Sequence, residues 1–161
     1  MGELRHGLGF DVHPRDPDRL LRLGGVTFPG EAGLGAHSDG DVVCHALSDA
    51  LLGAAALGDL GEHFPDDDPG LEGIAGTELV RRSVALLSAE GFSPRSCDLV
   101  VVADRPRIGR RRDEMRREIA GALGVDVGLV SVKATRPEGL GLSGDGAGCL
   151  ALAVVEGPSR P

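Results

Sequence analysis

The sequence predicts an α/β protein, in the form of an α+β two-layer sandwich whose single mixed sheet is covered on one face by helices. Two observations lead to this prediction. Apolar runs rich in Val and Leu alternate with longer segments of helical periodicity, in the order ββ(β)ααβαββ. The length of 161 residues suits one domain with a hydrophobic core, and four Phe with no Trp or Tyr leave that core to Leu, Val, Ile and Ala.

The first part of the chain predicts strands followed by a buried helix. Residues 4–12 read as a strand with a Gly-rich interior, and residues 20–28 read as one or two short strands joined by a Gly-Gly turn. The segment 39–57 is apolar on nearly all sides, which predicts a helix that is buried over most of its surface. Residues 58–76 are rich in Gly, Asp and Pro and are expected to form a loop.

The second part predicts two more helices and three strands. Thr77 is a candidate N-cap for a helix over 77–90, and Gly91 is its expected C′ residue. An arginine-rich helix follows a turn at 105–109 and ends at Gly124. The strands are expected at 97–103, 129–135 and 149–155.

Charge and cysteine content exclude several classes of protein. The formal net charge of −8 would repel a nucleic acid unless a strongly basic patch were present. The three cysteines lie far apart in apolar surroundings, which predicts free thiols in a reducing cytoplasm. No apolar run is long enough to span a membrane, and the first residues do not show the charged and then apolar segments of a signal peptide. We expect one domain over residues 1–157, with a tail at 158–161 that frays.

Three of the five histidines lie beside carboxylates in two nearby segments. Asp11 and His13 are two residues apart at the end of a predicted strand, so their side chains point to the same face. His37 and His45 flank a loop and the start of a helix, which can bring a third ligand over that strand end. Asp, His and His with one open position is the arrangement of a catalytic zinc centre, because a structural zinc fills all four positions. The residues therefore predict a catalytic metal site with a third ligand from this second pair.

The helix that carries His45 also predicts partners for that imidazole. A helix beginning near Asp39 would place Asp41, His45 and Asp49 on one stripe. A carboxylate one turn from a metal-bound imidazole can bind its second nitrogen and fix the tautomer. For Asp49, a solvated acidic face is the alternative interpretation. His6 and His63 lack such neighbours and are expected to be surface or loop residues.

Two loops have compositions that suit a polar, phosphorylated substrate. The run FPDDDP at 64–69 follows GDLG at 58–61 and offers carboxylates to sugar or polyol hydroxyls, with a solvated acidic turn as the alternative. The segment 133–148 contains five glycines, whose amides can turn toward a phosphate. Lys133 is the only Lys among 17 basic residues, which makes it a candidate for a place that needs a compact ammonium. Chance retention at an exposed strand position is its alternative.

These motifs together give the chain a family resemblance. It closely resembles the 2-C-methyl-D-erythritol 2,4-cyclodiphosphate synthases, lyases of the non-mevalonate pathway of isoprene and terpenoid biosynthesis. The motifs that carry the resemblance are, in order, FDVH, AHSDGDVVCHALSDALLGAAALGDLGEHFPDDDP, RPRIG, and SVKAT followed by EGLG. The long central motif is highly specific, and the match covers almost the whole chain. The resemblance implies the monofunctional form and a cytoplasmic homotrimer with each active site at a subunit interface.

The resemblance also implies a reaction and its metals. Family members convert 4-diphosphocytidyl-2-C-methyl-D-erythritol 2-phosphate to the cyclodiphosphate, and the 2-phosphate attacks the β-phosphorus and expels CMP. Zn²⁺ would be bound by Asp11, His13 and His45, and Mg²⁺ or Mn²⁺ would bridge the α- and β-phosphates. His37 then matches the residue beside the reacting phosphate instead of a metal ligand.

Three groups of substrate contacts are implied in the same way. The ribose and methylerythritol hydroxyls would meet Asp59, Leu60, Gly61, Phe64, Pro65, Asp66, Asp67 and Asp68. The cytosine would be enclosed by Ala103, Asp104, Arg105, Pro106, Arg107, Ile108 and Gly109. The phosphates would meet Thr135, Arg136, Pro137 and Glu138. The substrate set is completed by Asp11, Val12, His13, His37, Ser38, Leu142 and Asp145. The catalytic candidates are His37, Lys133, Thr135 and Arg136.

The chain departs from the family pattern in three places. Arg136 and Pro137 follow Thr135 where the family has a run of threonines, and because Arg can bind a phosphoryl group through two hydrogen bonds, we expect altered but retained catalysis. Leu142 and Asp145 replace a Phe and an Arg that line a cavity on the trimer axis in relatives, and carboxylates there would repel a prenyl diphosphate. In the acidic loop, an Asp also replaces the usual Thr at position 67.

Two alternative functions remain open on the residues alone. A non-catalytic trimeric relative that binds metal and nucleotide is suggested by the altered phosphate loop around Arg136, but the intact metal ligands argue against it. A generic zinc hydrolase would need a carboxylate base near the metal, and only Asp59 or Asp66 could serve.

Overall fold

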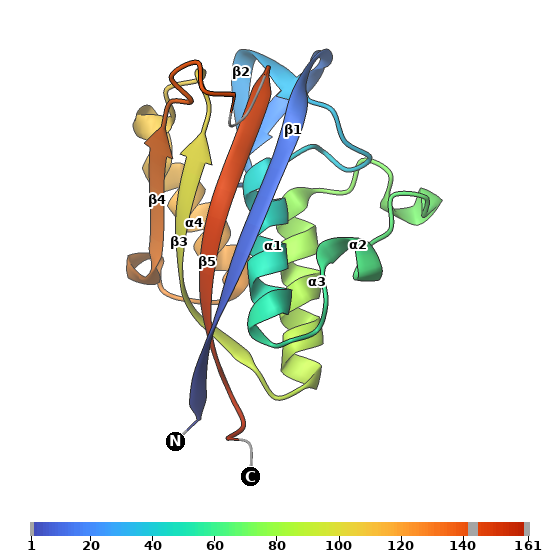
Figure 1. Cartoon of the computed structure of the whole chain (residues 1–161), viewed down its shortest axis with the longest axis vertical. Helices are drawn as coiled ribbons and strands as arrows, with labels where there is room; N and C mark the ends of the chain where they lie inside the picture. Colours follow the sequence, from blue (N-terminus) through green and yellow to red (C-terminus); the bar gives the residue numbers. More distant parts are fainter. Residues whose placement is uncertain (1, 142–144, 160–161) are drawn as a thin grey trace.

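The computed structural model describes residues 2–141 and 145–159, so the expectation for Leu142 lies outside the described residues. Five strands form one sheet in the order β2-β1-β5-β3-β4, in which β3 and β4 are parallel and the other neighbours are antiparallel (Figure 1). The strands are β1 Glu3–Leu23, β2 Val26–Leu34, β3 Ser93–Val102, β4 Val130–Thr135 and β5 Gly146–Gly157. The α-helices are α1 Val42–Ala54, α2 Leu60–His63, α3 Gly76–Ala89 and α4 Arg112–Leu123.

In Figure 1, α1 and α4 lie behind the strands, α3 packs beside α1 to the right of the sheet, and α2 lies farther to the right. The predicted mixed sheet with helices is therefore confirmed. On β5, Cys149, Ala151, Ala153 and Val155 face the helices and are fully buried. The intervening residues Leu150 and Leu152 point to the opposite face and remain 40% exposed. The face of the sheet that points away from the helices is therefore apolar and is not covered by any helix among the described residues.

The strand β1 is longer than the sequence predicts. The expected interruption after residue 12 is wrong, because β1 continues to Leu23. Its first half pairs with β5 and its second half with β2, so β1 changes partner at Pro14 and Arg15. The register between β1 and β2 shifts between Asp16 and Leu20. Such a bulge accommodates proline within an extended strand, which pattern alone does not reveal.

Two predicted helix starts also need correction. The helix α1 begins at Val42 and not at residue 39, because the Asp41 side chain caps it by accepting hydrogen bonds from Val43 N and Cys44 N. The helix α3 begins at Gly76, so Thr77 is not its N-cap. The predicted end of α4 at Gly124 is confirmed by the left-handed φ of 72° at that residue.

The expected loop 58–76 holds two short helical segments, α2 and a 3₁₀ turn at Pro69–Leu71. The three cysteines are free and buried, as their spacing predicts. Within the described residues, no helix is both long and apolar enough to cross a membrane.

The contact between β1 and α1 is made by backbone. A Cβ atom added at Gly7 would lie 1.8 Å from Ala50 O, and one added at Gly9 would lie 1.9 Å from Ala46 O. Only glycine leaves room for a helix backbone this close to a strand. These two positions therefore set the distance between the sheet and α1.

We expect Gly9→Ala to destabilise the protein by about 1–3 kcal/mol, because the new methyl group forces α1 away from the sheet. Urea unfolding monitored by circular dichroism measures this change. The matched control is Gly53→Ala on the exposed side of α1, where an added Cβ meets nothing within 4 Å. That variant should be stabilised by about 0.5–1 kcal/mol through helix propensity. Equal stability of the Gly9 variant and the unchanged protein would contradict the close approach.

Candidate metal centre and substrate cleft

The two elements in this close contact carry three converging ligand atoms. Asp11 and His13 project from the helix-facing side of β1, and His45 lies in the first turn of α1. His13 Nε2 lies 3.0 Å from His45 Nδ1, and Asp11 Oδ2 lies 2.8 Å from His13 Nε2 and 3.1 Å from His45 Nδ1. The three side chains therefore point at one spot.

This spacing suits a tetrahedral metal ion. A four-coordinate Zn²⁺ with bonds of about 2.0–2.1 Å would hold its ligand atoms about 3.3 Å apart. The three atoms observed here are only slightly closer together than that. Two imidazole nitrogens and one carboxylate oxygen form a suitable donor set, so Asp11, His13 and His45 could hold a divalent cation.

The electrostatics of the cluster also favour a cation. Burial alone would raise the pKa of Asp11, but hydrogen bonds and charge from His13 and His45 lower it to about 2. Burial lowers the pKa of His45, but the hydrogen bond and charge of Asp11, helped by the charges of Asp41 and Asp39, raise it overall. The carboxylate is thus ionised and both imidazoles lie in a negative field that a bound metal would neutralise.

The second nitrogen of His45 is held by Ser38. Its Nε2 lies 2.8 Å from Ser38 Oγ, and that hydroxyl oxygen also accepts from Gly40 N at 3.2 Å. Because a metal-bound Nδ1 leaves the proton on Nε2, the imidazole would donate to Ser38 and its tautomer would be fixed. The sequence resemblance places Ser38 among the substrate contacts only. In the sequence, only its place directly after His37 indicated that Ser38 could lie close to His45.

The predicted roles of Asp41 and Asp49 beside His45 are wrong. Asp41 is fully buried and accepts from Gly24 N at 2.8 Å and Gly25 N at 2.7 Å, in addition to capping α1. Asp49 Oδ1 accepts from Leu60 N at 2.7 Å and so ties α1 to α2. The physical reason is that α1 starts three residues later than expected, which leaves Asp41 outside the helix. Asp49 is only partly buried, yet it is not a free solvated side chain.

His37 lies close to the cluster without joining it. Its Nε2 lies 2.9 Å from the carbonyl oxygen of Asp68, at the end of the acidic loop. A carbonyl oxygen can only accept, so this nitrogen carries a proton and Nδ1 is left for another partner. Of the two candidates for the third metal ligand, the structure therefore selects His45. The His37 side chain instead connects its own loop to the loop that contains Asp68.

A cleft of about 510 Å³ opens beside the cluster and brings together much of the predicted site. Its lining includes Asp11, His13, His37, Ser38, His45, Asp59, Leu60, Gly61, Phe64 and Asp66. Three other predicted contacts, Pro65, Asp67 and Asp68, belong to the same exposed loop but do not line the cleft. Val12 alternates with Asp11 and His13, so its side chain lies on the other face of the sheet and is 43% exposed.

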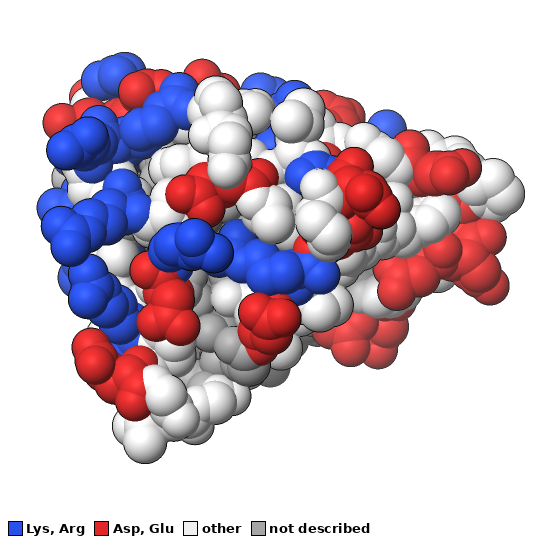
Figure 2. Space-filling view, turned by 90° about the horizontal axis from the view of Figure 1, so that it is seen from above, with Lys and Arg blue, Asp and Glu red and all other residues white. Residues whose placement is uncertain are grey.

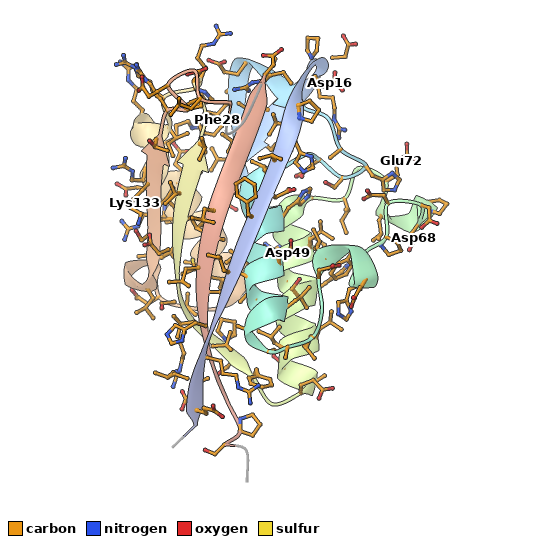
Figure 3. All side chains as sticks on the ribbon, viewed as in Figure 1. Asp16, Phe28, Asp49, Asp68, Glu72 and Lys133 are labelled. Carbon is orange, nitrogen blue, oxygen red and sulfur yellow. The ribbon has the colours of Figure 1, made fainter. Side chains whose placement is uncertain are left out.

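The remaining predicted residues lie elsewhere on this chain. Lys133 and Thr135 alternate with buried Val132 on β4 and so point to the uncovered face of the sheet. Lys133 Nζ pairs with Asp98 Oδ2 at 2.6 Å. In Figure 3, Lys133 lies at the β4 side of the molecule, whereas Asp49, Asp68 and Glu72 lie on the α2 side.

The loop 103–109, predicted to enclose the cytosine, does not line the cleft either. Asp104 and Arg105 line a separate hollow of about 470 Å³, together with Arg15 and Asp145. Arg15 donates to the Arg105 carbonyl, and Arg15 N donates to Asp145 O at 2.8 Å. None of the predicted residues from 103–109, 133–138 or 145 lines the metal cleft of this chain.

Charge is unevenly distributed over the molecule. In Figure 2, Lys and Arg side chains gather at the left, on the side of β4 and α4, and Asp and Glu side chains are concentrated toward the right, on the side of α2. The cleft side of the chain is thus the acidic one, and the side with the remaining predicted residues is basic.

Comparisons with known proteins agree with this geometry. The model of the YgbB family matches residues 4–156. The 2-C-methyl-D-erythritol 2,4-cyclodiphosphate synthase of Symbiobacterium thermophilum is 51% identical over 149 residues, which cover 92% of this chain and 95% of that protein. The bifunctional IspDF of Campylobacter jejuni superposes with a TM-score of 0.91 at 38% identity, over 98% of this chain and 43% of that one. A CDP complex of IspF from Plasmodium falciparum gives a TM-score of 0.82 at 27% identity, over 99% of both chains.

We expect His45→Ala to weaken Zn²⁺ binding by at least about a hundredfold, because it removes one of three protein ligands, and Ser38→Ala to weaken it by about 10–100-fold. Competition with a chromophoric chelator measures both affinities. The matched control is His63→Ala, since His63 Nε2 lies 2.7 Å from Leu57 O, outside the cluster. Unchanged affinity in the His45 variant would rule out this cluster as the metal site.

Proposed function

The chain belongs to the YgbB family, and from that membership and the site we propose that it converts 4-diphosphocytidyl-2-C-methyl-D-erythritol 2-phosphate to 2-C-methyl-D-erythritol 2,4-cyclodiphosphate and CMP. The observation that carries this conclusion is the convergence of Asp11, His13 and His45 at the edge of a cleft, within a chain similar to named synthases over nearly its whole length. The alternative of a non-catalytic relative is not supported by these comparisons.

In the proposed reaction, an oxygen of the 2-phosphate forms a bond to the β-phosphorus. The bond from that phosphorus to the oxygen shared with the α-phosphate breaks, and its electron pair leaves with CMP. When bound, Zn²⁺ at the cluster and Mg²⁺ or Mn²⁺ between the phosphates would neutralise charge as the two anionic groups approach. The task of the chain is then to position the substrate, without a protein nucleophile.

The residues of the cleft suit this task. Asp59 and Asp66 line it and can accept hydrogen bonds from the methylerythritol hydroxyls. Leu79 and Ile74 contribute apolar surface to the same cleft. His37, whose Nε2 is engaged by the Asp68 carbonyl, would present Nδ1 to the reacting phosphate. With a proton on Nδ1 as well, the ring would donate a charge-assisted hydrogen bond to that phosphate.

A single chain carries only part of this site, which supports a homotrimer. Lys133 and the phosphate and cytosine loops lie away from the metal cleft of their own chain, so a neighbouring copy would supply them. The uncovered sheet face carries Leu4, Leu8, Phe10, Val12, Leu150 and Leu152, each at least 40% exposed. Burial of such a face against other copies removes apolar surface from water.

The charge distribution supports the same assembly. A head-to-tail ring places one side of each subunit against a different side of the next. The basic β4 side of one copy would then meet the acidic cleft side of its neighbour (Figure 2). Complementary charge of this kind guides association and fixes orientation.

The function is tested by incubating the purified protein with the nucleotide substrate, Zn²⁺ and Mg²⁺ and following phosphorus NMR. We expect the cyclic diphosphate and CMP to appear together, because forming the new phosphorus–oxygen bond of the ring expels CMP. Free inorganic phosphate would indicate a hydrolase instead. Absence of any product would contradict the proposed function.

Subunit mixing tests the shared site. We expect His45→Ala and Lys133→Ala each to be nearly inactive, since each removes one half of every site. Mixed trimers formed by co-expression of both variants should recover roughly a quarter of full activity. Each site needs an intact metal-binding half from one chain and an intact Lys133 half from the next, and each half is intact in about half of the cases. Two Lys133 variants co-expressed with different tags serve as the control and should stay inactive. If the mixed trimer recovers nothing, the site does not span two subunits.

A further inference from the structure

The loop that carries His37 and Ser38 is held by an arginine on β1. One terminal nitrogen of Arg19 donates to the carbonyl oxygen of Ala36, and the other donates to that of Ser38. The two carbonyls flank His37. A planar guanidinium can make two such hydrogen bonds at a fixed separation, which an ammonium cannot do.

The opposite side of this loop is attached to the segment 68–74. Gly73 N donates to the His37 carbonyl at 2.9 Å, and Asp39 N donates to Ile74 O at 3.0 Å. The His37 ring is bonded to the Asp68 carbonyl, as described above. The loop therefore lies between Arg19 on one side and the exposed acidic loop on the other. Its first residue, Gly35, is also joined to β1, because Gly35 N donates to Pro14 O at 2.9 Å.

The local structure of β1 places Arg19 for this contact. The residue lies within the register shift between Asp16 and Leu20, where regular pairing with β2 is interrupted. Across from it, a Cβ atom added at Gly33 would lie 2.7 Å from the carbonyl carbon and oxygen of Arg19. The bulge and the glycine together let the partly buried Arg19 side chain reach the loop after β2.

The charge of Arg19 has no ion-pair partner in the part of the chain that the structure describes. Among the described residues, no carboxylate lies within 4.0 Å of its guanidinium, unlike Arg95, Arg111 and Arg116, which pair with Glu156, Glu114 and Asp113. Both of its observed partners are backbone carbonyls. Hydrogen bonds from an ionised donor are about twice as strong as neutral ones, so Arg19 is a strong restraint on this loop.

We propose that Arg19 is a positioning residue that sets the places of His37 and Ser38 at the same time. Through Ser38 it orients His45, and through the backbone on both sides of His37 it fixes the imidazole that faces the substrate. The part that concerns His37 rests on the proposed function. The part that concerns Ser38 and His45 rests on the metal centre alone.

The test compares Arg19→Met with Arg22→Met. The first keeps the apolar stem and removes both hydrogen bonds. The second changes an arginine on the same strand whose side chain makes no hydrogen bond or ion pair with the described residues. We expect amide exchange in residues 35–40 and 72–76 to become about tenfold faster in Arg19→Met, since two charge-assisted hydrogen bonds are lost. Arg22→Met should leave exchange there unchanged.

Two further readouts separate positioning from general stabilisation. Zn²⁺ affinity should fall by about tenfold in Arg19→Met, because Ser38 would no longer be held in place to bind the second nitrogen of His45. The kcat for CMP release should fall by at least about tenfold, with KM changed less than kcat, because ground-state contacts in the rest of the cleft remain. Arg19→Lys keeps the charge but replaces two donor nitrogens at a fixed separation by a single nitrogen, so its effects should lie between those of the unchanged protein and Arg19→Met. This variant decides the question if Arg19→Met fails to fold.

The outcomes distinguish this proposal from the proposed function. If the unchanged protein releases no CMP, the proposed function fails, whereas exchange and metal affinity still decide the role of Arg19. Exchange that rises equally in the sheet and in residues 35–40 would overturn the proposal, because Arg19 would then stabilise the whole chain. Metal affinity and kcat that match those of Arg22→Met would overturn it as well.

Discussion

The direct contact between the backbones of β1 and α1 is the constraint on which the rest of the structure depends. Gly7 and Gly9 let the helix approach the strand without any intervening side chain. Asp11 and His13 continue along the same face of β1, and His45 lies in the first turn of the helix that covers it. The metal centre is therefore a product of helix packing. A larger residue at either position would push α1 away from β1 and so move His45 away from Asp11 and His13.

The sequence predicts those parts of the molecule that depend on local patterns. The spacing of Asp11 and His13 follows from strand periodicity, and the end of α4 follows from Gly124. The pattern leaves the third ligand open, and only the family resemblance selects His45. The continuation of β1 past Pro14, the Asp41 contacts and the Arg19 contacts were missed, because each depends on partners between 16 and 19 residues away or on a second strand.

The two faces of the sheet have different roles. One face buries the core against the helices and ends at the metal cleft, and the other presents apolar residues together with Lys133 and Thr135. A strand places alternate residues on opposite faces, so neighbours in the sequence such as Val12 and His13 serve different surfaces. The proposed trimer uses this property, because one sheet supplies part of two separate sites. The departures at Arg136 and Asp145 lie outside the metal cleft, where they leave its ligands intact.

Asp41 connects the folding of the chain to the chemistry of the metal centre. Its carboxylate accepts from Gly24 and Gly25 in the β1–β2 turn and from Val43 and Cys44 at the start of α1. Four backbone amides thus hold this carboxylate inside the protein, and its charge helps to raise the pKa of His45. A residue whose hydrogen bonds are structural therefore also contributes to the electrostatics of the metal centre. The carboxylate that ties the β1–β2 turn to the start of α1 thus also adds to the negative field that Asp11 produces at His45.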